Sequence, residues 1–374
     1  MGGEVYQGTL VNRGGASRRR IAAVDAARAL ALIGMFAVHL LPGTDPDGSV
    51  STSDLVFRGR SAAAFAVLAG VALSLTGRTS AAGLVVRAAL IGVLGLLLGS
   101  LDSGIAVILA YYAVLFLLVI PLVGLRTRVL AASTVLVAVG VPVLSHVVRG
   151  GLPPKRGPSP DGGDLAEPAT LVTELLLTGY YPALAWTAYL CAGLAVGRLD
   201  LRSRRIAVWL GGAGVALAVG SVAVSQLLLS LAPARAALPA DASGVLVSGT
   251  TPPTTWWWLA TMGPHSSTPL DLAHTIGTAL ALLGLLLLLE PLAGRALVPL
   301  AWLGSMTLTL YSLHVLAVAD GVGPQDPEEL FAVHVVVALL VGIGVRSHVA
   351  RGPLEHVVSV ASNAATRTAA RRRG

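Results

Sequence analysis

Three ionisable side chains share one apolar stretch near the start of the sequence. Asp25, Arg28 and His39 lie within residues 20–41, which are otherwise mostly alanine, leucine and other apolar residues. They are spaced by close to whole turns of a helix with 3.6 residues per turn, so they fall on one helix face. Arg28 and His39 would be separated by about 16 Å along the axis. One helix can therefore present a cation near one end and an imidazole near the other.

Each of these side chains has a chemical and a structural interpretation. The Arg28 guanidinium can bind two phosphate oxygens at once, which makes it a candidate for a phosphate-bearing ligand. Asp25 lies three residues earlier and either serves the same ligand or simply pairs with Arg28. A neutral imidazole can accept a proton from an attacking hydroxyl or amine, so His39 is a candidate general base, with a packing histidine as the alternative.

Two later segments carry further histidines, His265 and His314, which we expect near the same membrane face as His39. The polar residues that accompany them are Ser266, Asp271, His274, Thr307 and Tyr311. Three histidine-bearing helix ends could thus meet in one pocket. No HExxH or comparable spacing of two ligands occurs, so the sequence predicts no metal site. Ser266 lacks a GxSxG context and is not expected to act as a nucleophile.

The composition is that of a membrane protein. The chain has 374 residues, of which 55% are hydrophobic and 12% charged, and its mean hydropathy is +0.78. A soluble domain of this length could not carry so much apolar surface. The net charge of +7 sits in short hydrophilic links, which argues against a nucleic-acid partner. The single Cys191 excludes an intramolecular disulfide.

The hydrophobic pattern predicts an all-α, polytopic bundle of about ten transmembrane helices in the lipid bilayer, with no evident internal repeat. The expected spans are residues 20–41, 57–77, 81–100, 104–125, 129–148, 180–196, 206–231, 269–289, 297–318 and 330–349. Basic residues flank the first and last spans, so both termini are expected to be cytoplasmic. The domain division is a basic segment at 1–20, a transmembrane domain at 21–349 and a basic tail at 350–374.

Two motifs in the first half of the chain resemble a known family. They are VDAARALALIGMFAVH and, after a short loop, SDLVFRGRSAAAFAVLAGVALSL. GYYPALAWTAYLCAGLAVGRLDL, PHSSTPLDL and LGSMTLTLYSLHV extend the likeness more weakly. Together they resemble the catalytic domain of heparan-alpha-glucosaminide N-acetyltransferase and its bacterial relatives, which are multi-helix membrane acyltransferases.

The resemblance implies transfer of an acyl group, typically acetyl, from cytoplasmic acetyl-CoA to an amine or hydroxyl of a sugar-like or lipid-linked acceptor at the opposite face. In the family's eukaryotic members the catalytic histidine lies in the first outer loop, but residues 40–60 contain none. His39 therefore takes this role, or His265 or His314 supplies it. Acyl-CoA would be a donor substrate and no cofactor would be bound permanently.

The remaining candidates divide between the two substrates. The expected donor-binding residues are Asp25, Arg28, Arg87, Tyr111 and Tyr112. The expected acceptor-binding residues are Asp54, Ser266, Asp271 and Tyr311. We expect a multi-pass protein of the inner cell membrane, and the sequence leaves a homodimer open. The alternative function is a transporter, although inverted repeats and interrupted helices, which are common in transporters, are not evident.

Overall fold

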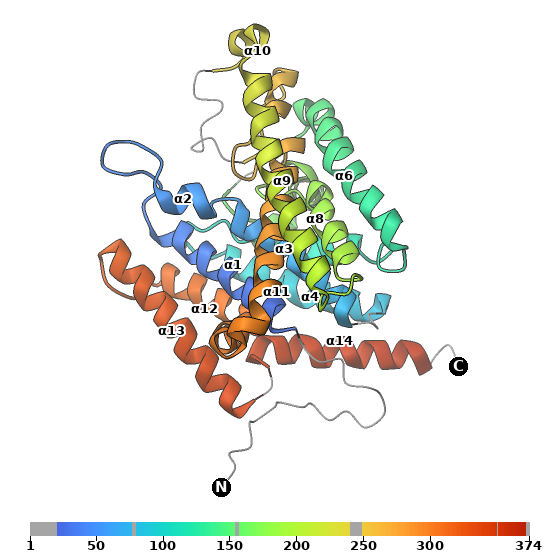
Figure 1. Cartoon of the computed structure of the whole chain (residues 1–374), viewed down its shortest axis with the longest axis vertical. Helices are drawn as coiled ribbons and strands as arrows, with labels where there is room; N and C mark the ends of the chain where they lie inside the picture. The colour runs from blue at the N-terminus through green and yellow to red at the C-terminus, as the bar shows by residue number, and fades with distance from the viewer. Residues whose placement is uncertain (1–20, 77–79, 154–156, 240–248, 350, 372–374) are drawn as a thin grey trace.

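The computed structural model describes residues 21–76, 80–153, 157–239, 249–349 and 351–371, and every regular element in these ranges is a helix. The expected all-α, polytopic helix bundle is thereby confirmed (Figure 1). The predicted basic segment at 1–20 and the last arginines of the tail lie outside the described residues.

Among the described residues, seven helical segments are long and apolar enough to cross a membrane. They are α1 (Ala22–Leu40), α2 (Thr52–Phe57) together with α3 (Arg60–Thr76), α4 (Ala81–Gly99), α6 (Thr127–Val148), α9 (Arg204–Leu229), α11 (Pro269–Gly304) and α13 (Pro327–His348). The shorter apolar helices are α5 (Leu109–Leu118), α7 (Pro168–Thr173) with the π-helical turn Glu174–Thr178, α8 (Ala183–Val196) and α12 (Thr307–Ala319). Three of the ten expected spans correspond to α5, α8 and α12, so the number of crossings stays a prediction.

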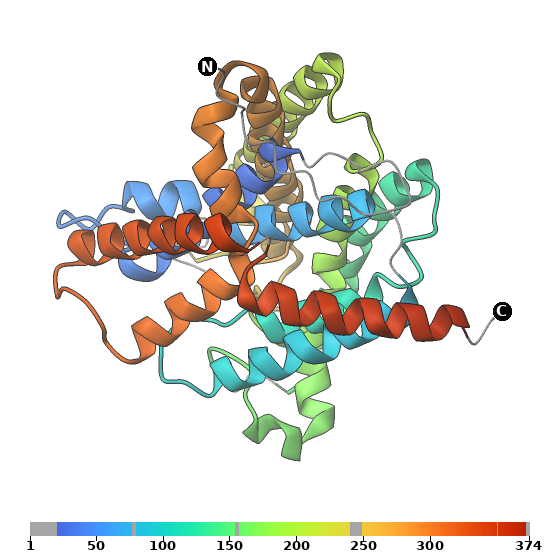
Figure 2. The same cartoon turned by 90° about the horizontal axis from the view of Figure 1, so that it is seen from below.

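The remaining helices lie outside the apolar spans. They are α10 (Ala232–Ala237), α14 (Pro353–Arg371) and the 3₁₀ turns Gly163–Ala166 and Trp256–Ala260, whereas the 3₁₀ turn Arg149–Gly151 ends the span of α6. Figure 1 shows α14 running crosswise to α9 and α11 at one end of the bundle, and Figure 2 shows it from below. The Ser362 hydroxyl donates to the Gly83 carbonyl at 2.9 Å, which docks α14 on α4. The segment expected to form a basic tail at 350–374 therefore contains a helix, α14, that packs against the bundle.

The expected helix at 104–125 is wrong at its start, because residues 102–108 are non-helical and α5 begins at Leu109. The Ser159 hydroxyl accepts from the Val107 amide at 2.7 Å and donates to the Ile105 carbonyl at 3.0 Å. The Tyr181 hydroxyl donates to the Ala106 carbonyl at 3.1 Å. Non-helical backbone inside a membrane protein persists only where its polar groups find such partners.

The expected helix at 297–318 is also wrong at its start. A kink at Ala293 (φ −122°, ψ 25°) interrupts α11 between the expected spans 269–289 and 297–318, but residues 297–304 form the last part of α11, the chain breaks at Ser305 and Met306, and α12 begins at Thr307. The break follows Gly304, where a side chain would collide with the Asp25 carbonyl of α1. The close crossing of α1 and α11 thus occurs where one helix ends. Similarly, Gly59, with φ of +76°, separates α2 from α3 within the expected span at 57–77.

Glycines allow the central helices to approach closely. A side chain at Gly193 of α8 would collide with the Val67 carbonyl of α3, and one at Gly277 of α11 would meet the backbone of α9 at Ala218. Small residues at such crossings let helix backbones pack by van der Waals contact inside a membrane. α1 lies within this packing and contacts α3, α11, α12 and α13.

Candidate functional site

The structure brings two of the predicted catalytic histidines into contact. The Nδ1 atom of His39, near the end of α1, lies 3.0 Å from the Nε2 atom of His314 in α12. Phe36, one turn earlier on α1, stacks on the His314 ring with 4.1 Å between ring centroids. His314 is buried and His39 is partly buried, so this contact joins a buried imidazole of α12 to a partly exposed one of α1.

A third histidine, His334 of α13, completes this group. Its Nδ1 atom lies 2.9 Å from the Nδ1 atom of His314. The sequence reasoning did not single out His334. One signal in the sequence could have identified it. His334 lies close to the start of the last expected span, at the same predicted depth as His39 and His314.

His265 lies in the loop before α11 and is enclosed by aromatic rings. Its ring centroid is 4.7 Å from that of Tyr180 and 5.1 Å from that of Tyr181, and it stacks parallel to Trp186 at 6.3 Å. Burial, together with the smaller effects of the charges of Arg58 and His39, lowers the pKa of His265 to about 3. His265 is therefore neutral at physiological pH and lies close enough to His39 to interact with it electrostatically.

The turn that carries His265 is held by two predicted acceptor-binding residues. The Asp271 carboxylate accepts from the Ser267 amide at 3.0 Å, and the Ser266 hydroxyl donates to the Thr268 hydroxyl at 3.4 Å. His265 and Ser267 both have positive φ, at 61° and 53°. These hydrogen bonds stabilise a backbone conformation that non-glycine residues rarely adopt.

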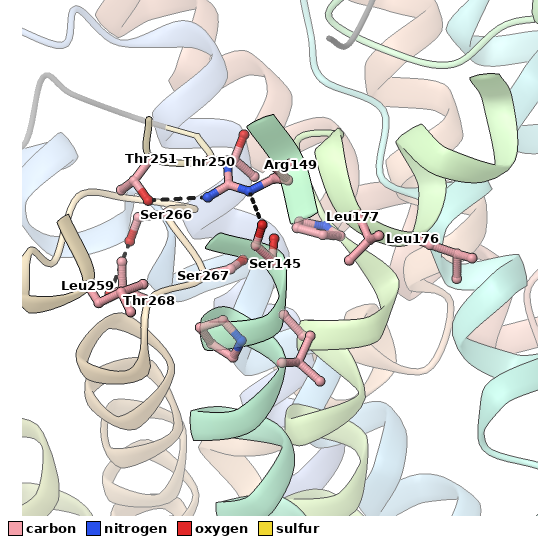
Figure 3. Close-up of a pocket in the computed structure, with 14 residues that line it drawn as sticks. Ser145, Arg149, Leu176, Leu177, Thr250, Thr251, Leu259, Ser266, Ser267 and Thr268 are labelled. Carbon is pink, nitrogen blue, oxygen red and sulfur yellow. Dashed lines mark hydrogen bonds between the residues drawn. The ribbon is translucent and has the colours of Figure 1, made fainter. Parts of the chain in front are cut away.

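The same turn forms one wall of a small pocket, shown in Figure 3. Ser266, Ser267 and Thr268 line it together with the end of α6 and the start of α8. The Arg149 guanidinium donates to the Ser145 carbonyl at 3.3 Å and to the Thr251 hydroxyl at 3.5 Å. The pocket therefore combines hydroxyl groups and one cation on its polar side.

Asp54, another predicted acceptor-binding residue, is fully buried and pairs with Arg58 on the next turn. An added side chain at Gly43 would touch both members of the pair. The Asp54–Arg58 pair thus packs beneath the loop that follows α1. The neighbouring Arg60 donates to His274 of α11 at 3.0 Å, which joins α3 to α11.

Arg28 lies toward the start of α1 among cationic and aromatic side chains. It donates to the Thr307 hydroxyl at 2.8 Å, lies 3.8 Å from the Asp25 carboxylate and stands 5.5 Å from the centroid of the Phe65 ring. Arg87 of α4 stands over the Phe116 ring at 5.4 Å.

Arg87 also experiences the charges of Arg28 and Arg351. The sequence reasoning did not single out Arg351, because the residue precedes α14 and is brought here by the docking of that helix. Three arginines from three parts of the chain are therefore gathered in one region, an arrangement suited to binding an anion.

The three predicted tyrosines lie on α5 and α12. The Tyr112 hydroxyl is buried without a hydrogen-bond partner among the described residues, and its ring meets Phe65 edge-on at 5.9 Å. The Tyr311 hydroxyl accepts from the Ile108 amide at 3.4 Å. The Tyr111 hydroxyl contacts Glu174 at 3.5 Å and accepts from the Tyr180 amide at 3.2 Å. Tyr111 is thus hydrogen-bonded to the turn before α8, whereas Tyr112 retains a free hydroxyl.

A family model described as the catalytic domain of heparan-alpha-glucosaminide N-acetyltransferase matches residues 20–229. No curated protein matches the chain. The matched range contains Asp25, Arg28, His39 and Arg87 and ends before His265 and His314.

Proposed function

Because this multi-pass membrane protein belongs to the heparan-alpha-glucosaminide N-acetyltransferase catalytic family, we propose that it transfers an acyl group, most simply acetyl, from acyl-CoA to an amine or hydroxyl of a sugar-like acceptor. One observation carries the proposal. Arg28 and His39 project from the same helix, and each contacts α12, through Thr307 and His314. The contacts with α12 would therefore hold the phosphate-binding end and the proton-accepting end of α1 at fixed positions relative to each other.

The donor would bind through its phosphates at Arg28, Arg87 and Arg351. Asp25 and Thr307 hold the Arg28 side chain, which leaves part of the guanidinium for phosphate oxygens. The unpartnered Tyr112 hydroxyl is available to hydrogen-bond the donor along its length. Tyr111 and Tyr311 would shape this path by holding the turn before α8 and the non-helical backbone before α5. We place this donor site on the cytoplasmic side, where the basic flanks are expected.

The acceptor would approach from the opposite face, near His39. The pocket in Figure 3 offers Ser266, Thr251 and Arg149 to acceptor hydroxyls. Asp271 and Asp54 would act on the acceptor indirectly, by holding the backbone that forms the site. Asp271 accepts from the Ser267 amide, and Asp54 pairs with Arg58. The lipid bilayer surrounds the bundle, so a lipid-linked sugar could present its headgroup at this face.

The chemistry requires no covalent enzyme intermediate. The acceptor hydroxyl or amine attacks the thioester carbonyl while His39 takes its proton, and a tetrahedral intermediate forms. The intermediate collapses, the C–S bond breaks, and the CoA thiolate leaves and is protonated. The remaining histidine candidates are His314, which contacts His39, and His265, which lies beside it.

The direct test is incubation of the purified protein with labelled acetyl-CoA and a membrane extract, followed by identification of the labelled product. We expect a labelled sugar-containing product and release of free CoA. Absence of both acetyl-CoA binding and labelled product would contradict the proposal. Movement of a substrate across vesicle membranes without consumption of acyl-CoA would instead indicate a transporter.

A further inference from the structure

Three imidazoles are joined in a line that leads away from the proposed reaction centre. His39 contacts the Nε2 atom of His314, and the Nδ1 atom of His314 contacts His334, with distances of 3.0 and 2.9 Å. Both ring nitrogens of His314 are thus engaged. We propose that His39, His314 and His334 form a proton relay that carries the acceptor's proton from His39 to the α13 side of the bundle. This inference rests on the proposed acyl transfer.

The geometry favours a relay over a metal site. A metal ion needs lone pairs from several rings that converge on one point. His314 instead directs its two nitrogens at two different neighbours, so the three rings form a chain. Within the described residues no group of three histidine, cysteine or acidic side chains is arranged to hold a metal ion.

Each imidazole can pass a proton because it has one nitrogen on each side. In the starting state His39 donates from Nδ1 to His314, which donates from Nδ1 to His334, and the Nε2 lone pair of His39 is free. When His39 gains the acceptor's proton at Nε2, its Nδ1 proton moves to Nε2 of His314. The Nδ1 proton of His314 then moves to Nδ1 of His334, which releases its Nε2 proton. One proton enters and one leaves, and each ring ends in its other neutral tautomer.

The surroundings of the chain support this direction of transfer. Phe36 stacks on His314 and shields the central ring, which is buried, and His265 interacts electrostatically with His39. His39 and His334, at the two ends of the relay, are both partly buried. Asp326, which caps α13, and Glu328 and Glu329 in its first turn lie within about two turns of His334. The relay therefore leads the proton toward the acidic start of α13.

The test compares His334→Ala with His348→Ala, which removes an exposed histidine from the same helix. In the acetyl-transfer assay we expect His334→Ala to lower kcat by about 10- to 100-fold with KM for acetyl-CoA unchanged. Added imidazole should restore a large part of the rate, because it can replace the missing ring. The His314→Ala/His334→Ala double variant should be no slower than His314→Ala alone, since both residues serve one path.

Full kcat in His334→Ala, or a loss that imidazole does not restore, would overturn the relay. A second measurement separates this outcome from failure of the proposed function. Nitrogen-15 NMR of histidine-labelled protein in lipid should show coupling across both N–H···N hydrogen bonds without any substrate. Absence of either coupling contradicts the relay, whereas both couplings in a protein that transfers no acyl group would contradict the proposed function alone.

Discussion

His39 and His314 lie 275 positions apart in the chain, yet their ring nitrogens are 3.0 Å apart. Earlier on the same two helices, Arg28 donates to Thr307. The two contacts occur in the same order along α1 and α12, so these helices run in the same direction. This arrangement agrees with the predicted topology, in which both spans cross outward. It also means that the spacing of Arg28 and His39 on α1 sets the distance between the two proposed binding regions.

Replacing His39 tests the proposed general base. We expect His39→Ala to lower acetyl transfer by about 100-fold or more, because a positioned base contributes rate enhancements of this order. Acetyl-CoA binding should be unchanged, since the arginines lie at the other end of α1. Transfer at the normal rate would reject His39, and His265→Asn and His314→Gln would then be assayed in the same way.

Arg28→Gln tests the donor site. Loss of charge-assisted hydrogen bonds to phosphate should weaken acetyl-CoA binding by about 1.5–3 kcal/mol, or roughly 10- to 100-fold in Kd. The matched control is Arg205→Gln, which removes the same charge from an exposed position at the start of α9. Equal affinity of the two variants in a titration would exclude Arg28 from donor binding.

His265 should make stability depend on pH. Its pKa is about 3 in the folded protein and 6.5 in the unfolded chain. Between these values only the unfolded state binds the proton, so stability falls as pH decreases below 6.5 and is insensitive to this group above it. The contribution approaches about 1.4 kcal/mol per pH unit.

His265→Asn should remove this contribution, and asparagine tolerates the positive φ at this position. We therefore expect Tm to fall less steeply from pH 6.5 to 4.5 in the variant than in the unmodified protein, measured in detergent. His348→Asn, at an exposed position on α13, serves as the control. Identical slopes for all three proteins would contradict the burial of a neutral His265.

Gly193→Ala tests the close crossing of α3 and α8. The added methyl group would collide with the Val67 carbonyl, and overpacking of this kind costs about 1–3 kcal/mol. Gly212→Ala in α9 is the control, because nothing lies within 4 Å of the added carbon there. A lower Tm for Gly193→Ala alone would support the crossing, and equal values would not.

Glu355→Ala tests the docking of α14. The Glu355 carboxylate accepts from the Leu308 amide at 2.6 Å and from the Thr309 amide and hydroxyl at 3.2 and 2.6 Å, and so caps the start of α12. Its loss should cost about 1–2 kcal/mol and speed trypsin cleavage at Arg367 within α14. Glu355→Gln retains an acceptor oxygen and should have an intermediate effect. Unchanged cleavage would show that this cap does not hold α14.

The sequence alone determined the membrane class, the all-α fold and the family, because hydrophobic composition, helical periodicity and local motifs are properties of neighbouring residues. The shared face of Asp25, Arg28 and His39 follows from the same periodicity. The assigned roles of these residues stay predictions for the experiments above.

Only the tertiary structure decided which distant groups meet. The non-helical backbone before α5 is hydrogen-bonded to Ser159 and Tyr181, the break between α11 and α12 occurs where Gly304 crosses Asp25, and His334 acquires its partner through the docking of α13. Such contacts join segments far apart in the chain. Their hydrogen bonds and steric limits override the local preference for helix, so a hydrophobic pattern read along the chain could not reveal them.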